Sequence, residues 1–120
     1  MAARIWPVAG LLAAALSAAT ALAQEWPSRP VRLVVPFSPG GIADTSARTI
    51  ADRLAARLGQ SVVIENKVGA AGNIGTEMVA KSAPDGYTLL LGYDGTIVVN
   101  PHVYAKLGFD VLNDFAPVTK

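Results

Sequence analysis

The stretch VRLVVPFSPGGIADTSARTIADRLAARLG, residues 31–59, decides the fold. Its first part, residues 31–35, is mostly β-branched and aliphatic and stops at Pro36, which is the pattern of a buried strand. Over residues 43–58 apolar side chains recur every three or four positions, which predicts an amphipathic helix, and Gly59 follows as a helix stop. A strand that passes through a glycine-rich turn into a helix is typical of an α/β fold with a parallel sheet.

Strand and helix signals continue to alternate beyond Gly59. Since parallel strands need crossover connections, this order predicts βαβ units with right-handed crossovers and a mainly parallel sheet flanked by helices. Asn73 and Asn100 are each expected to cap a helix. The further elements expected are strands at 61–65 and 87–91, helices at 73–82 and 100–107, and another extended stretch at 115–118.

Residues 1–23 have the features of a secretory signal peptide. Arg4 gives a positive start, residues 8–19 are apolar except for one serine, and the final three residues, Ala-Leu-Ala, match a small-x-small cleavage pattern. An uncleaved membrane anchor is the alternative, but it needs about 20 strongly apolar residues, and this run is alanine-rich and interrupted. We therefore expect export, cleavage after Ala23 and a mature chain over residues 24–120.

Composition excludes several classes of function. The chain has no cysteine and one histidine, so within it a thiolate nucleophile, a cysteine metal site and a metal site built on a pair of histidines are excluded. Of ten basic residues, Arg4 lies in the expected signal peptide, which leaves nine basic against nine acidic residues. This balance gives no reason to expect nucleic acid as a partner. We expect no catalytic residue, no metal, no cofactor, and a monomer.

Ligands of open parallel sheets bind beyond the carboxyl ends of the strands. Three segments rich in glycine and small polar residues, 36–44, 68–73 and 92–96, are expected at that edge. The segment 36–44 contains two consecutive glycines just before a helix. The free N–H groups and the positive dipole end of that helix suit a carboxylate or a phosphate. The alternative is an ordinary strand-to-helix turn in which Asp44 or Thr45 satisfies those N–H groups itself.

The second segment carries glycines at the first, fourth and seventh positions of residues 69–75. This spacing differs from the dinucleotide fingerprint, which has glycines at positions one, three and six. Either a second helix N-terminus aimed at the same edge, or close packing of a helix on the sheet, accounts for these glycines.

Taken in order, the motifs resemble those of the substrate-binding proteins of tripartite tricarboxylate transporters, also called Bug receptors. The similarity extends over nearly the whole expected mature chain, and the series of motifs is far more specific than any one of them. The motifs are WPSRPVRLVVPFSPGG at 26–41, GQ at 59–60, ENK at 65–67, GAAGNIG at 69–75, PDGYTLL at 84–90 and DFAPVT at 114–119.

The resemblance implies a periplasmic binding protein of type II, with two lobes, that delivers a small carboxylic acid to a membrane permease. Residues 24–120 would form the first part of lobe 1, and the second lobe would be absent. Asp44 matches an acidic position with a loop-ordering role. The ligand contacts that the resemblance implies lie in the loop after the first strand and at two later loops: Phe37, Ser38, Pro39, Gly40, Gly41, Asp44, Gly72, Asn73 and Thr96.

Two other functions remain open at this point. One is an exported α/β enzyme that uses the 36–44 loop as an anion cradle, although only Ser38 and Asp44 are available there as reacting groups. The other is a truncated gene product without a function of its own, since family members are longer and cross to a second lobe near the point where this sequence stops.

We predict that residues 24–120 bind dicarboxylates weakly or not at all, because a cleft needs both lobes to surround a ligand and exclude water. Isothermal titration calorimetry with a series of dicarboxylates measures this directly. A micromolar dissociation constant would contradict the prediction.

Overall fold

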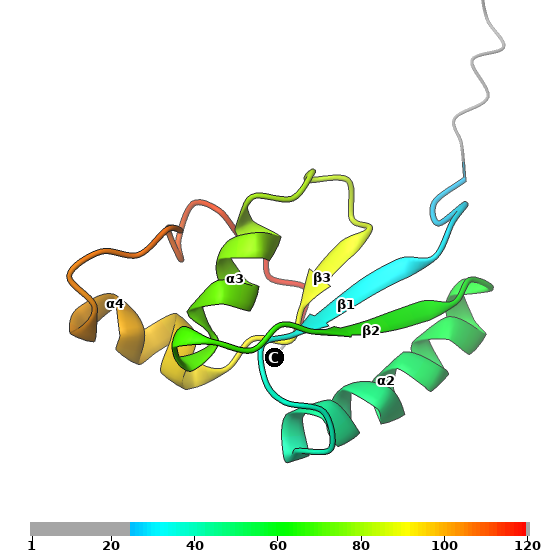
Figure 1. Cartoon of the computed structure of the whole chain (residues 1–120). Helices are drawn as coiled ribbons and strands as arrows, with labels where there is room; N and C mark the ends of the chain where they lie inside the picture. The colour runs from blue at the N-terminus through cyan, green and yellow to red at the C-terminus, as the bar shows by residue number, and fades with distance from the viewer. Residues whose placement is uncertain (1–24, 120) are drawn as a thin grey trace, which may run out of the picture.

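The computed structural model describes residues 25–119, and the expected signal peptide at 1–23 lies outside the described residues. Strands and helices alternate along the chain (Figure 1). The elements are β1 (Val31–Val35), α2 (Ile42–Leu58), β2 (Val62–Asn66), the 3-10 turn η1 (Ala70–Gly72), α3 (Asn73–Ala80), β3 (Thr88–Leu90), the π-helical turn η2 (Gly95–Val99) and α4 (Asn100–Val103).

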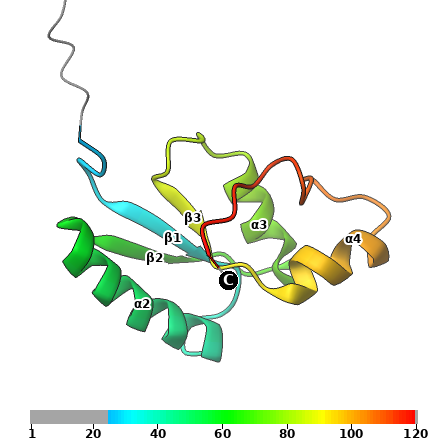
Figure 2. The same ribbon diagram turned by 180° about the vertical axis from the view of Figure 1, so that it is seen from behind.

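The three strands form a parallel sheet in the order β2-β1-β3, so β1 lies in the middle. Leu33 at the centre of β1 pairs with Ile64 of β2 and Leu89 of β3. Because right-handed crossovers are the rule, stepping from β1 to β2 and then back past β1 to β3 carries the two helices to opposite faces. Figures 1 and 2 show α2 on one side of the sheet and α3 on the other, which confirms the predicted architecture.

The core lies between β1 and α2. Leu33 and Val35 of the strand pack against Ala47 of the helix, and a second small residue, Ala51, is buried one turn further on. Small side chains at these two positions let the helix approach the sheet closely. Ile50, one of the apolar residues that recur along the helix, is half exposed, because the inward face of α2 is centred on Asp44, Ala47 and Ala51.

The ends of the later helices differ from expectation. Gly72, with positive φ, is the N-cap residue of α3, and Asn73 makes no capping bond. Asn100 has helical φ and ψ because a π-helical turn precedes it, and the helix ends at Val103. Both asparagines are buried, and the Asn100 Nδ2 donates to the Asn73 Oδ1 over 2.6 Å. The two side chains therefore join two segments of the chain and cap neither helix.

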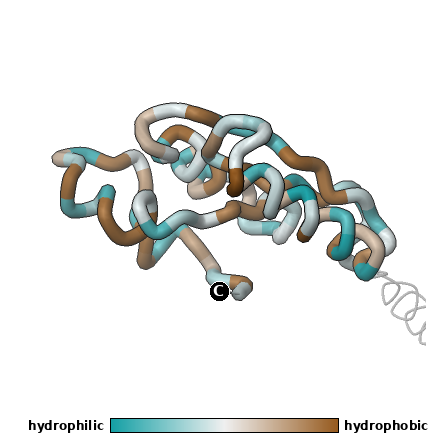
Figure 3. Tube along the Cα trace, turned by 90° about the horizontal axis from the view of Figure 1, so that it is seen from below, coloured by the Kyte–Doolittle hydropathy of each residue, from teal (hydrophilic) through white to brown (hydrophobic). Residues whose placement is uncertain are grey.

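The segment 115–118, expected to be extended, pairs with no strand of the sheet. Within residues 25–119 none of the helices has the length and apolar character needed to cross a membrane. Figure 3 shows further hydrophobic segments at the α4 end of the chain, away from the sheet. Several large apolar side chains there are exposed: Val98, Val99, Val103 and Leu112.

Replacing Leu33 by alanine is expected to lower the free energy of unfolding by about 2–5 kcal/mol, because it leaves a cavity between β1 and α2. The matched control is Ile42→Ala at the start of α2, whose side chain is 90% exposed, with an expected change within about 0.5 kcal/mol. Urea denaturation followed by circular dichroism measures both variants, and equal effects would contradict this description of the core.

Candidate functional site at the carboxyl edge of the sheet

Three loops meet beyond the carboxyl ends of the strands. After β1 the chain turns toward α2, on one face of the sheet. After β3 it turns toward η2, on the side of α3. The edge between β1 and β3 is therefore a topological switch point (Figure 1). A Cβ atom added to Gly72 would lie 2.6 Å from the Thr96 Oγ1 and 3.6 Å from the Phe37 Cζ. The loops after β1, β2 and β3 are therefore in contact, at the place where ligands of such sheets bind.

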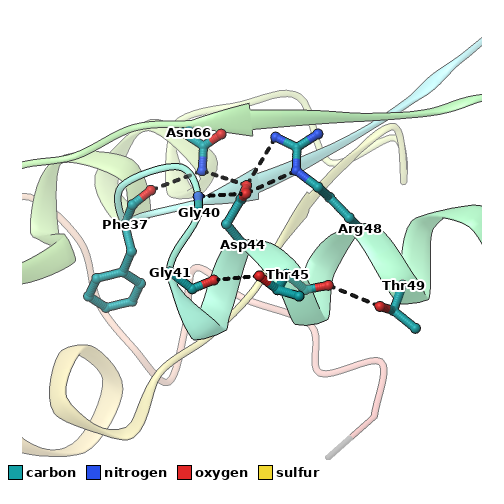
Figure 4. A network of polar contacts seen from close by, with 8 residues as sticks. All are labelled: Phe37, Gly40, Gly41, Asp44, Thr45, Arg48, Thr49 and Asn66. Carbon is teal, nitrogen blue, oxygen red and sulfur yellow. Dashed lines mark hydrogen bonds and ion pairs between the residues drawn. The ribbon is translucent and has the colours of Figure 1, made fainter.

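The first loop is ordered by the carboxylate of Asp44 (Figure 4). Its Oδ2 accepts a hydrogen bond from the Gly40 N–H at 2.9 Å, where Gly40 has a left-handed φ of +82°. The Asn66 Nδ2, at the end of β2, donates both to the Asp44 Oδ1 and to the Phe37 carbonyl, each at 3.0 Å. The conformation of this loop is thus tied to the helix that follows it and to the neighbouring strand.

Arg48, one turn along α2, provides the counter-charge for Asp44. The Arg48 Nε and a terminal guanidinium nitrogen donate to the two carboxylate oxygens at 2.9 and 3.2 Å. These bonds, followed by those from the Gly40 N–H and the Asn66 amide, hold the pKa of Asp44 far below its ordinary value. The Asp44 side chain is buried while the Arg48 side chain is half exposed, so the pair is open to solvent on one side only.

The first turn of α2 has no side-chain cap on its N–H groups. Gly41 is the N-cap residue, and its carbonyl accepts both the N–H and the hydroxyl of Thr45, at 2.9 and 3.0 Å. The N–H groups of residues 42–44 precede that first helical bond, and the Asp44 carboxylate accepts from Gly40, which lies ahead of the helix. Asp44 and Thr45 therefore accept no side-chain hydrogen bond from these first N–H groups, although the ionised Asp44 carboxylate places a negative charge in the first turn.

The second loop is held in a strained conformation. Ala70 and Ala71 both have positive φ, at 46° and 53°, which costs about 1–3 kcal/mol for each such residue. The Ala71 carbonyl accepts two side-chain hydrogen bonds from beyond β3, one from the Thr96 hydroxyl at 3.1 Å and one from the Asn100 amide at 3.3 Å. These bonds hold the backbone immediately before the N-terminus of α3 at Gly72, which also lacks a side-chain cap.

The third loop brings an aromatic ring to the same edge. Tyr93 lies against Phe37 of the first loop, with ring centroids 5.2 Å apart and planes at 85°. The Tyr93 carbonyl accepts hydrogen bonds from the Thr96 and Ile97 N–H groups, which starts the π-helical turn.

The sequence did not predict the contacts that three residues make at this edge, namely those of Asn66, Tyr93 and Asn100. No motif marks Tyr93. The Asn-Pro pair at 100–101 was assigned to a helix cap because the π-helical turn before it leaves no pattern in the sequence.

The residues expected at the site fall into three groups in the structure. Those of the first loop are exposed or half-buried at the edge, apart from Asp44, which is buried in its own hydrogen-bond network. Gly72 and Asn73 are buried where the second loop enters α3. Thr96 is also buried, and its hydroxyl proton is already directed to Ala71, so a ligand contact by Thr96 requires one of its oxygen lone pairs. Contact of all these residues with a ligand stays a prediction.

The chain belongs to the tripartite tricarboxylate transporter family receptors, whose family model matches residues 46–120. It is 47% identical over 109 residues to a UPF0065 protein of Bordetella pertussis, covering 89% of this chain and 34% of that protein. It is 43% identical over 118 residues to Protein BugT of the same organism, covering 97% and 36% of the two chains. The chain thus spans about a third of the length of these relatives.

Solved structures of similar proteins have the same fold. The periplasmic binding protein BugD matches with a TM-score of 0.74 and 44% identity, over 77% of this chain and 30% of that one. MatC of Rhodopseudomonas palustris with bound malate matches with a TM-score of 0.74 and 44% identity, over 78% of this chain and 32% of that one. An R. palustris protein solved with adipate matches with a TM-score of 0.70 and 48% identity, over 73% of this chain and 29% of that one. The family and these neighbours are solute-binding receptors and not enzymes, which confirms the resemblance inferred from the motifs.

We expect Asp44→Asn to lower stability at neutral pH and to lose this effect in acid. A carboxyl whose pKa is depressed in the folded state contributes its stability above the ordinary value of 3.8, and loses it as pH falls below that value toward the folded pKa. The gap between parent and variant in urea midpoints should therefore shrink below about pH 4.

Asp52→Asn is the matched control, because it removes the same charge from an exposed position two turns further along the helix. The assigned role of Asp44 would be contradicted if the difference in urea midpoint between Asp44→Asn and the parent stayed constant from pH 7 to pH 3. It would also be contradicted if Asp52→Asn changed the urea midpoint by the same amount.

Proposed function

We propose that this chain forms the first part of lobe 1 of a periplasmic receptor that captures a small carboxylic acid for a tripartite tricarboxylate-type transporter. One observation carries the proposal. The helices α2 and α3 both begin at a glycine at the same edge of the sheet, and neither N-terminus has a side-chain cap. Backbone N–H groups at such ends, together with the helix dipole, attract a carboxylate. Malate and adipate in the solved relatives agree in chemical class.

The two helix ends contribute differently. At α2 the N–H groups of Ile42 and Ala43 precede the first helical hydrogen bond and can donate to a ligand. At α3 the N–H groups of Gly72 and Ile74 already donate to the Gly69 carbonyl, at 3.0 and 3.5 Å, so this end acts mainly through its dipole. The first turn of α2 is therefore the carboxylate cradle of the proposal.

Recognition in this lobe depends on the backbone. No lysine or arginine occurs in residues 36–44, 68–73 or 92–96, so the three loops offer amide donors and no cationic side chain. Gly40 and Gly41 are exposed and lack a Cβ, which lets a ligand carboxylate approach the start of α2 directly or through a bridging water. Phe37, Ser38 and Pro39 complete the first loop.

The same geometry favours binding without turnover. Asp44 is the carboxylate that borders the first loop, and its low pKa and four hydrogen bonds keep it ionised and fully occupied. A general base works best with a pKa near the working pH, so Asp44 is poorly suited to proton transfer and well suited to ordering the loop. These properties argue for a receptor over an exported enzyme.

Export and delivery complete the proposal. The signal peptide at 1–23, with cleavage after Ala23, would place the mature chain from Gln24 onward in the periplasm. There the partners are a small carboxylate and the membrane permease of the transporter, and the receptor acts as a monomer.

We expect millimolar adipate to shift the backbone amide resonances of Gly41, Ile42 and Ala43 in an isotope-labelled sample of the chain. The neutral analogue adipamide should leave them unchanged, because it lacks the charge that the helix N-termini attract. Gly72→Ala should weaken adipate binding about tenfold, since its Cβ would meet the Thr96 Oγ1 at 2.6 Å and force the loops at this edge apart.

The matched control for Gly72→Ala is Gly92→Ala, where the added Cβ makes only an ordinary contact of 3.8 Å with Ile97. The proposed carboxylate site would be ruled out by shifts confined to amides outside the three loops, or by equal responses to adipate and adipamide.

A further inference from the structure

Two aromatic rings span the switch point of the sheet. Phe37 follows β1 and Tyr93 follows β3, the two strands that pair directly at that edge. Their rings meet edge to face at 5.2 Å, a geometry that aromatic pairs prefer. Figure 4 shows the Phe37 ring pointing away from the Asp44 network, so the pair is separate from the contacts that order the first loop.

The position of the Tyr93 ring is fixed by the backbone around it. A Cβ atom on Gly95 would lie 2.5 Å from the Tyr93 Cε1, so the ring occupies the space that a side chain at position 95 would fill. The Tyr93 carbonyl, bonded to the N–H groups of Thr96 and Ile97, anchors the residue to the start of η2. Tyr93 is nevertheless 57% exposed, so much of the residue is accessible from solvent.

This aromatic pair borders the proposed carboxylate cradle. Phe37 lies in the same loop as Gly41, the N-cap residue of α2, and its Cζ is 3.6 Å from the position of a Cβ on Gly72 at the start of α3. The Phe37 carbonyl is held by Asn66, which also bonds Asp44. The proposed cradle and the aromatic pair therefore share the first loop, so one ligand can contact both.

An acidic side chain lies beside the rings. Asp94, next to Tyr93, is exposed and negative. Near the first loop, Arg48 is paired with Asp44, and Lys67 is paired with Glu65. An uncharged ligand body against the rings avoids the repulsion from Asp94 and buries apolar surface on the exposed face of Tyr93.

We infer that Tyr93, together with Phe37, is a specificity-determining residue that selects acids with an aromatic body. The inference rests on the proposed carboxylate site and adds the chemical class of the ligand. A third ring joins an edge-to-face pair favourably, by an amount that corresponds to about threefold to tenfold in affinity beyond the burial of area.

The test compares benzoate with cyclohexanecarboxylate, which has the same charge and a similar size without the aromatic ring. Dissociation constants are obtained from titrations of the labelled chain, with the amides of Ile42 and Ala43 reporting on the cradle. We expect benzoate to bind about threefold to tenfold more tightly in the parent and in Tyr93→Phe, and the preference to vanish in Tyr93→Leu. Tyr104→Leu, at an exposed tyrosine beyond α4, should retain it.

The outcomes separate the two proposals. Equal binding of the two acids by the parent, or a preference that survives Tyr93→Leu, overturns the role of Tyr93 while the responding amides still support the carboxylate site. If the acids shift only amides outside the loops 36–44, 68–73 and 92–96, the carboxylate site fails, and the inference built on it fails as well.

Discussion

The buried carboxylate of Asp44 is the interaction on which the functional edge of this protein depends. A buried charge is costly unless it is paired and hydrogen-bonded, and here four hydrogen bonds from the loop, the helix and the neighbouring strand meet that need. Because the donors come from three different segments, the carboxylate fixes their relative positions. The exposed glycines of the first loop therefore hold one arrangement before a ligand arrives, which lowers the entropic cost of binding.

The second loop shows the same principle with neutral groups. Two alanines in the left-handed region would relax if they were free, and the Ala71 carbonyl is kept in place by Thr96 and Asn100 from beyond β3. Strain of this kind is found where a backbone conformation serves a function. Here it positions the start of α3 beside the first loop, so that both helix ends face one edge.

Backbone groups and side chains thus have different roles at this edge. The proposed donors for the carboxylate are backbone groups, which do not vary with sequence, whereas the rings that border them are side chains, which do. Such a division suits a fold whose relatives hold acids as different as malate and adipate. In this chain the variable part includes Tyr93, held in place by Gly95 and packed against Phe37.

The sequence by itself determined the three parallel strands, the helix α2 with its stop at Gly59, the family, and the loops that form the edge, because hydrophobic period, glycine and proline act locally. It could not give the sheet order, the exposure of Ile50, or the partners of Asn66, Asn73, Tyr93 and Asn100. Those partners lie 22–56 positions away along the chain, which no local pattern encodes. Asn100 resembled a helix cap in sequence, and only the tertiary structure showed that it clamps a distant loop.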